Sequence, residues 1–133
     1  MRRIAIALVA AAALLTGPAL QAKPRLTSQQ QLDKLLDGRV AGKPEHCISH
    51  FDTRDMQVLD KTAIVYGWGN TIWVNVPRNA QDLDDDNIMV TRTSSSQLCD
   101  LDIVTTIDRS AGMFNGSISL GEFVPYRRVA KAD

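Results

Sequence analysis

The sequence has little of the charge excess that marks a nucleic-acid-binding or membrane-surface protein. Its 15 lysines and arginines are balanced by 15 aspartates and glutamates, whereas a nucleic-acid-binding domain normally carries a concentrated basic surface. The main basic cluster, Arg127 and Arg128 with Lys131, lies near the C-terminus and is typical of a solvated tail. There is no pattern of a basic amphipathic helix that would lie on anionic lipid. We therefore expect no nucleic acid among its partners.

Sequence signatures of catalysis are also missing. The stretch nearest to a G-x-S-x-G elbow, residues 115–119, lacks the second glycine. The serines at 94–96 have no base nearby in the sequence, although His46 or His50 could approach them through folding. Paired carboxylates are present but are explained equally well as solvated charges: Asp52 with Asp55, and Asp100 with Asp102. We expect no catalytic residue and no cofactor.

Long apolar runs are confined to the N-terminus. Residues 1–22 combine a positive start, an apolar core over residues 4–15 and a helix break at residues 16–18, which predicts a secretory signal peptide. The apolar core is too short to span a bilayer, which needs roughly 20 residues. We expect cleavage after Ala22 and, because no cysteine follows to accept a lipid, no stable membrane anchor afterwards. The expected location is periplasmic or secreted.

Cleavage would leave one domain of ordinary size. Loss of Arg2 and Arg3 reduces the 15 basic residues to 13 against 15 acidic ones, so the mature chain is slightly acidic. The expected organisation is a signal peptide over residues 1–22, an N-terminal lead and short helix over 23–44, a β-rich domain over 45–128 and a tail over 129–133.

Cysteine is scarce, with only Cys47 and Cys99 in the chain. An exported protein meets an oxidising environment, so an even number of cysteines favours an intramolecular disulfide. That bridge would close a loop of about 53 residues and, on the chain-entropy estimate, stabilise the fold by roughly 4 kcal/mol. The C-x-x-C spacing of a thioredoxin-like redox pair is absent. We expect the bridge to reinforce the fold.

The mature chain predicts one helix followed by strands. Residues 28–31 match a capping box with Ser28 as N-cap and Gln31 reaching back, and leucines follow at helical spacing. Short apolar runs bounded by turns then predict strands over residues 46–51, 56–59, 62–66, 71–76, 88–90 and 101–107, and a last strand or pair of strands over 118–124. We expect a mainly β (α+β) fold, a small antiparallel sandwich or partly open barrel with one N-terminal helix and one disulfide.

An acidic loop is the most site-like stretch of the sequence. Asp82, Asp84 and Asp86 stand at the first, third and fifth places of a calcium-loop pattern, where hard oxygens can converge on one cation. The twelfth place is Thr93, so the bidentate glutamate is missing, and no helix pattern flanks the loop. These aspartates either bind a metal ion or form a solvated acidic turn, and the solvated turn is the simpler interpretation.

Two histidines flank the first cysteine. In a strand, His46 and His50 would share a face but lie about 13 Å apart, too far to bind one ion. Because Cys47 is expected to be oxidised, a zinc site here is disfavoured. Surface or partly buried histidines are the simpler interpretation.

Aromatic residues make up only 5% of the chain, and three of them gather around one turn. Tyr66, Trp68 and Trp73 bracket the glycine-rich residues 67–70. Trp68 could project from this turn as an anchor for an envelope protein or a glycan. Alternatively, both indoles cover the edge of a small core. The sequence leaves both interpretations open.

Four segments form a distinctive combination: the spacing from Gly38 to Cys47, the TAIVY hairpin, the SQLC segment and the LGEFVPY close. In this combination, over roughly residues 34–128, the chain resembles a group of small exported proteobacterial proteins that share a domain of unknown function. The resemblance implies an exported domain with paired cysteines and no established activity, so it assigns no site residues. Many members look like lipoproteins, whereas this chain lacks the acceptor cysteine.

These observations favour a non-enzymatic binding or structural module of the periplasm. The alternative is a small envelope hydrolase or an inhibitor of one. A binding module would expose Trp68 on an apolar patch, whereas a hydrolase would place His46 or His50 beside an acidic or hydroxyl group in a pocket. The sequence predicts no oligomeric state.

Overall fold

The computed structural model describes residue 17 and residues 22–130 of the 133-residue chain. The signal peptide expected over residues 1–22 lies almost entirely outside the described residues, as does the end of the expected tail. Within the described ranges, no helix is long and apolar enough to cross a membrane.

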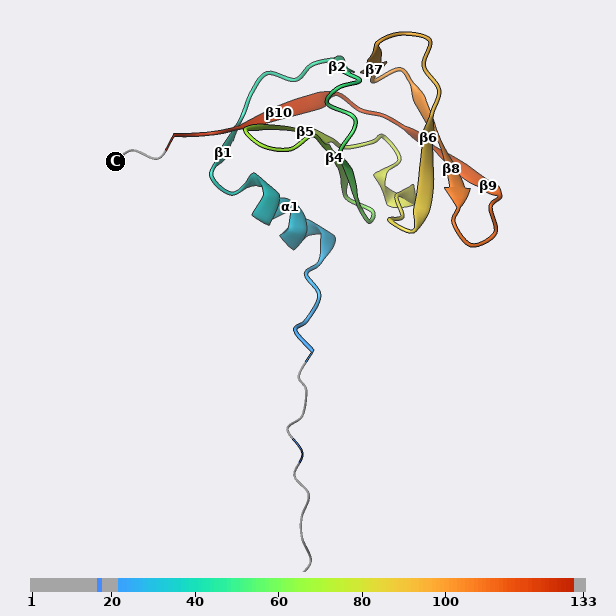
Figure 1. Cartoon of the computed structure of the whole chain (residues 1–133), viewed down its shortest axis with the longest axis horizontal. Helices are drawn as coiled ribbons and strands as arrows, with labels where there is room; N and C mark the ends of the chain where they lie inside the picture. The colour runs from blue at the N-terminus through green and yellow to red at the C-terminus, as the bar shows by residue number, and fades with distance from the viewer. Residues whose placement is uncertain (1–16, 18–21, 131–133) are drawn as a thin grey trace, which may run out of the picture.

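The described chain folds into one α-helix, one short 3₁₀ helix and ten strands (Figure 1). The helices are α1 (Ser28–Leu36) and η1 (Ala80–Asp82). The strands are β1 (Arg39–Ala41), β2 (Cys47–Ser49), β3 (Met56–Leu59), β4 (Ala63–Tyr66), β5 (Thr71–Asn75), β6 (Asn87–Thr91), β7 (Gln97–Cys99), β8 (Ile103–Asp108), β9 (Phe114–Ser119) and β10 (Phe123–Arg128). The mainly β prediction with one N-terminal helix is confirmed.

The strands form three antiparallel sheets. A five-stranded sheet has the order β1-β10-β5-β4-β3, a three-stranded sheet the order β6-β8-β9, and β2 pairs with β7 as a ribbon. Strands β3 and β6 end their sheets and are not paired with each other, so no closed barrel forms. The hairpin after β3 nevertheless reaches the segment before β6, because Lys61 N–H donates to Leu83 O at 3.2 Å.

Both faces of the five-stranded sheet are covered. Strand side chains alternate between faces, and one face packs against α1 in a cluster of Leu32, Leu59, Ala63, Val65, Ile72 and Val74. The opposite face packs toward the other two sheets in a larger cluster of Ile48, Ile64, Tyr66, Leu83, Leu98, Val104, Ile118, Leu120 and Phe123. Alternation along residues 71–76 predicts Ile72, Val74 and Val76 on one face. Ile72 and Val74 share the face that packs against α1, whereas β5 ends at Asn75 and Val76 is exposed.

The helix begins one residue before the predicted position. Thr27, not Ser28, is the N-cap: its hydroxyl accepts from Gln30 N–H at 3.2 Å, and Gln30 Oε1 accepts from Thr27 N–H at 2.9 Å. Gln31 instead donates through Nε2 to Leu26 O at 3.1 Å. The prediction of Ser28 with Gln31 was wrong because successive hydroxyl residues and successive glutamines offer the same capping box in two registers.

Several strand boundaries also differ from the prediction. The strands expected over residues 46–51, 62–66, 71–76 and 88–90 run over Cys47–Ser49, Ala63–Tyr66, Thr71–Asn75 and Asn87–Thr91, and residues 118–124 contain the end of β9 and the start of β10. The strand expected over residues 101–107 starts at Ile103, because a turn separates β7 from β8. This turn is closed by Asp102, whose N–H donates to Cys99 O at 3.0 Å and whose carboxylate accepts from Cys99 N–H at 2.8 Å. The short strand β1 was not predicted, since three residues carry no readable period and its partner β10 lies far along the chain.

Strand β10 continues through Pro125, where the sequence predicted an end. Pro125 lies opposite Trp73 of β5, and its carbonyl accepts from Gly42 N–H at 2.7 Å on the other side, just beyond β1. The ladder bond lost to the missing proline N–H therefore falls where β1 has already ended. Proline is tolerated at such a position.

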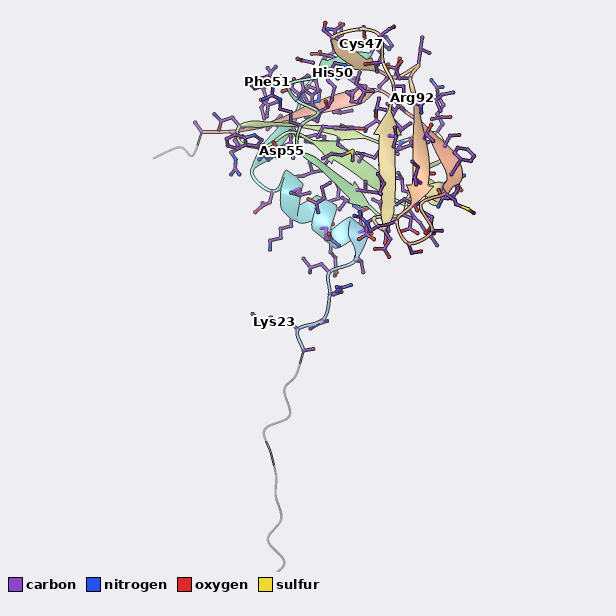
Figure 2. All side chains as sticks on the ribbon, turned by 45° about the vertical axis from the view of Figure 1, so that its right-hand side comes forward. Lys23, Cys47, His50, Phe51, Asp55 and Arg92 are labelled. Carbon is purple, nitrogen blue, oxygen red and sulfur yellow. A yellow bond between two sulfur atoms is a disulfide. The ribbon has the colours of Figure 1, made fainter. Side chains whose placement is uncertain are left out.

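The predicted disulfide joins Cys47 to Cys99. The two residues are direct partners in the β2–β7 ribbon, so the covalent bond crosses between its strands. Figure 2 shows Cys47 and His50 at the end of the molecule far from Lys23.

Candidate functional site

Trp68 lies at the tip of the turn between β4 and β5. Gly67 and Gly69 on either side have φ of 81° and 80°, in the left-handed region that glycine adopts without strain. The backbone of this turn is tied to the preceding loop, since Gly67 N–H donates to Asp55 O at 2.8 Å. The binding interpretation expected Trp68 to be exposed on an apolar patch; Trp68 is 79% exposed.

Two arginines donate hydrogen bonds to backbone carbonyls of this turn. The guanidinium of Arg39, from β1, donates to Gly69 O at 2.8 Å and to Asn70 O at 3.0 Å. Its Nε–H also donates to Leu35 O at the end of α1, at 3.0 Å. The backbone N–H of Arg128 donates to Asn70 O at 2.8 Å. The turn that carries Trp68 is therefore attached both to the helix and to the edge of the sheet.

The environment of Arg39 combines partial burial with a like charge. Burial first, and the neighbouring Arg128 second, lower the pKa of Arg39. A guanidinium stays charged in proteins even so. Arg39 thus supplies a fixed positive charge beside the turn.

A groove of about 340 Å³ lies beside Trp68, between α1, β3 and the turn. Its lining combines apolar and polar side chains, among them Leu35, Arg39, Met56, Gln57, Trp68 and Ile72. Pockets that bind ligands commonly have this make-up, with apolar walls and a few polar groups that fix orientation.

The other two aromatic residues of the predicted binding set lie elsewhere. Tyr66 is in the core, with its ring centroid 5.8 Å from that of Phe123. Trp73 is half-buried and packs against the same core cluster. The alternation of β4 and β5 turns both side chains toward the inner face, so the inclusion of Tyr66 in the surface around Trp68 was wrong. Of the three predicted binding residues, Trp68 is the one that is exposed.

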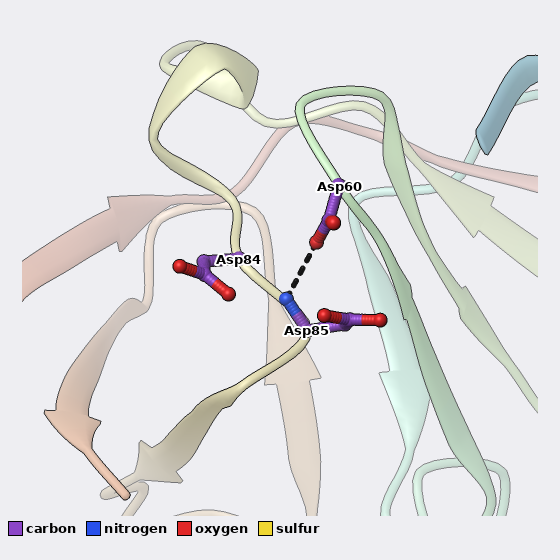
Figure 3. Close-up of side chains that lie close together, drawn as sticks. All are labelled: Asp60, Asp84 and Asp85. Carbon is purple, nitrogen blue, oxygen red and sulfur yellow. Dashed lines mark hydrogen bonds between the residues drawn. The ribbon is translucent and has the colours of Figure 1, made fainter. Parts of the chain in front are cut away.

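The predicted metal ligands do not converge as a set. Asp82 accepts from Asn79 Nδ2 at 2.9 Å, and Asp84 accepts from Asp86 N–H at 2.9 Å. The carboxylates that gather are those of Asp60, Asp84 and Asp85, with oxygens within 4.8 Å of one another (Figure 3). Of the predicted three, only Asp84 belongs to this group.

Asp60 enters the group because the β3–β4 hairpin reaches the acidic loop. Its Oδ1 accepts from Asp85 N–H at 2.6 Å (Figure 3). The charge of Asp60, followed by desolvation and the charges of Asp86 and Asp84, raises the pKa of Asp85. All three carboxylates are exposed. The contact could not be predicted from the sequence, because Asp60 lies in a turn more than twenty residues before Asp84.

The two histidines have separate partners. His46 Nδ1 lies 2.8 Å from Asp100 Oδ2 and 3.8 Å from Glu122 Oε1, and the hydrogen bond to Asp100 above all raises the pKa of His46. His50 Nε2 lies 2.7 Å from Thr93 Oγ1 and 2.9 Å from Ser95 O. The hydrolase alternative expected a histidine beside an acidic or hydroxyl group in a pocket, and both kinds of contact occur: His46 with the carboxylate of Asp100, and His50, which lines a cavity, with the hydroxyl of Thr93. Among the described residues, neither histidine is hydrogen-bonded to a serine hydroxyl, the nucleophile of a serine hydrolase.

Comparison with models of protein families, with curated proteins and with solved structures gives no match. The fold and site define a mainly β, disulfide-bridged domain with one exposed indole beside a groove. Its function has to be argued from that site, because a fold of this class hosts many functions.

Proposed function

We propose that the protein is an exported, non-enzymatic binding module of the bacterial envelope, which recognises a protein or glycan partner through Trp68. The observation that carries this proposal is the 79% exposure of Trp68 on a turn attached to α1 and to the sheet. The groove beside it offers a place for the partner's side chain or sugar ring.

An exposed tryptophan on a well-supported turn is suited to binding for two physical reasons. An aromatic side chain buries about 150–250 Å² in an interface, and at roughly 25 cal/mol per Å² this contributes several kcal/mol. A turn held by Arg39 loses little conformational entropy when a partner binds. Tryptophan is accordingly among the residues enriched at binding hot spots.

Export is supported by the signal-like residues 1–22 and by the Cys47–Cys99 disulfide. Disulfides persist in oxidising compartments and are rare in the cytosol. Cell fractionation followed by intact-mass measurement tests this step. The expected product is an envelope or medium species that begins at Lys23 and carries no free thiol; a cytosolic full-length species with two thiols would contradict it.

The binding proposal is tested by pull-down from envelope extract with the immobilised mature protein. Trp68→Ala should lose the partner that the wild type retains. Leu101→Ala is the matched control, because Leu101 is an equally exposed apolar residue (81%) on the turn between β7 and β8. Equal recovery by wild type and Trp68→Ala would exclude Trp68 as the anchor.

The glycan alternative can be examined directly by fluorescence. The chain has two tryptophans, so a Trp73→Phe variant reports on Trp68 alone. Soluble peptidoglycan fragments should shift its emission to the blue if a glycan stacks on the indole. No shift, together with a protein captured in the pull-down, would assign the site to a protein partner.

A further inference from the structure

A cavity of about 250 Å³ lies where the two larger sheets fail to close. It opens between the β3–β4 hairpin, strand β6 and the loop that follows β2. Its lining includes His50, Met56, Tyr66, Met89, Thr91 and Leu98. This cavity is at the open seam of the fold, where backbone pairing between β3 and β6 would otherwise lie.

The lining is unusually rich in thioether sulfur. The chain has four methionines; Met1 lies in the predicted signal peptide and Met113 is exposed elsewhere, on the β8–β9 turn. The remaining two, Met56 and Met89, line this one cavity from strands of different sheets. Met56 lies directly opposite Tyr66 in the β3–β4 pairing, and Met89 packs against the same core cluster as Tyr66.

His50 supplies an imidazole to the same cavity, and its hydrogen bonds define the tautomer. The carbonyl of Ser95 can only accept, and the hydroxyl of Thr93 itself donates to that carbonyl at 3.3 Å. Nε2 of His50 must therefore carry the hydrogen that both oxygens accept. In the neutral ring the lone pair is then on Nδ1, which has no hydrogen-bond partner among the described residues.

Because its lone pair is not used in a hydrogen bond among the described residues, Nδ1 can coordinate an ion, as the coordinating nitrogen of metal-binding histidines does. Such residues usually donate their second ring N–H to a carbonyl, which fixes the tautomer and the ring orientation. The cavity lining contains no carboxylate, and both cysteines are oxidised. Hard cations such as Ca²⁺ or Mg²⁺ therefore find few suitable ligands here, whereas neutral thioether and imidazole groups favour Cu(I).

We propose that His50, Met56 and Met89 bind one Cu(I) ion in this cavity. His50 coordinates through Nδ1 and the two methionines through Sδ. Both methionines line the cavity, and the three rotatable bonds of methionine let each sulfur adjust its position toward an ion. No electron transfer is involved, because the ion binds and leaves as Cu(I).

The test is a Cu(I) titration of the disulfide-bonded mature protein against a chromophoric Cu(I) chelator under anaerobic conditions. One ion should bind per chain. Met89→Leu, Met56→Leu and His50→Gln should each weaken binding by at least the roughly tenfold that loss of a group supporting a metal ligand costs. Met113→Leu and His46→Gln are the matched controls and should bind as the wild type does. A thiol assay after the titration excludes binding by reduced cysteines.

A second measurement does not depend on the folding of variants. Ag(I), a redox-inert substitute for Cu(I), should shift the ε-methyl NMR signals of Met56 and Met89 in the wild type and leave that of Met113 in place. Absence of one-to-one binding, equal shifts of all three signals, or full affinity in Met89→Leu would each overturn the proposal. Met56 also lines the groove beside Trp68, whereas Met89 does not, so the Met89 variant separates this proposal from the proposed function.

Discussion

The five-stranded and three-stranded sheets use the same antiparallel pairing but bury their strands differently. All four residues of β4, an inner strand of the larger sheet, are buried, because α1 covers one face and the core cluster covers the other. In the smaller sheet, Val104 and Ile118 face the core while Ile103 and Phe114 are exposed on the outer face. Apolar residues of one strand therefore differ in burial, and burial depends on whether another helix or sheet covers the face on which the residue lies.

The edge strands of the two sheets also differ in whether other residues occupy their backbone groups. Strand β9 is sealed by the segment before η1: Asn79 donates to Ser117 O and accepts from Ser119 N–H, each at 2.9 Å, and Arg78 N–H donates to Ser119 O at 2.9 Å. A side chain that occupies edge groups in this way prevents another chain from pairing there. The facing edges of β3 and β6 instead border the cavity that contains His50.

The largest expected effect on stability comes from replacing a buried phenylalanine, compared with an exposed one, by alanine. Phe123→Ala, at a position with 0% exposure, should lower the free energy of unfolding by about 3–5 kcal/mol. Phe114→Ala, at 69% exposure on the outer face of the small sheet, should change it by less than about 0.5 kcal/mol. Urea denaturation of both variants measures the contrast, and similar losses would show that something covers the outer face.

The disulfide joins the two strands of the β2–β7 ribbon and does not connect the ribbon to either larger sheet. Replacing both cysteines by alanine should cost about 2–4 kcal/mol, because the unfolded chain regains the entropy of an open loop. Thermal unfolding of the double variant, with the reduced wild type for comparison, checks this. An unchanged melting temperature would mean that the ribbon unfolds independently of the two larger sheets.

Opening the sealed edge should have a smaller effect on stability and a clear effect on association. Asn79→Ala removes the two hydrogen bonds to β9 and should cost about 1–3 kcal/mol. The exposed edge should then promote concentration-dependent self-association, measured by sedimentation. Asn115→Ala is the control, since among the described residues the side chain of Asn115 bonds only to that of Asn87; association of both variants would exclude loss of the β9 edge contacts as the cause.

The smallest expected effect is a pH dependence at the ribbon. Asp100 raises the folded-state pKa of His46 above its ordinary value of 6.5. The protonated histidine therefore stabilises the fold fully below the unfolded pKa, and this contribution disappears as the pH rises through the folded value.

His46→Gln should accordingly lower the melting temperature more at acidic pH than at alkaline pH, with Asp100→Asn as the matching partner variant. A difference from the wild type that is constant with pH would contradict the ion pair. Because His46 is exposed on the surface, salt should reduce the effect.

Much of the fold was predictable because its signals are local. The β3–β4 hairpin over residues 56–66 and the strand from Thr71 follow from turn residues between apolar runs. The disulfide followed from an even number of cysteines and the expected compartment, and the structure confirms it. The capping box was found but placed one residue late, since both registers satisfy the same local rule.

The candidate sites were less predictable because their residues meet across sequence-distant elements. Trp68 was identified from its flanking glycines, but the supporting contacts of Arg39 depend on a strand that the sequence did not reveal. Tyr66 was misplaced because the face on which a strand residue lies depends on which side the sheet is covered. Asp60 could not be grouped with Asp84 without the hairpin contact.

The sequence by itself determined the strand-rich, helix-capped character of this protein and the pairing of its two cysteines, because residue period, turn chemistry and cysteine number act over short stretches or on the chain as a whole. Only the tertiary structure decided that the two larger sheets remain unpaired between β3 and β6, and that His50, Met56 and Met89 line the cavity there. The physical reason is that strand register and sheet closure result from many packing contacts made together, and no single stretch of sequence encodes them.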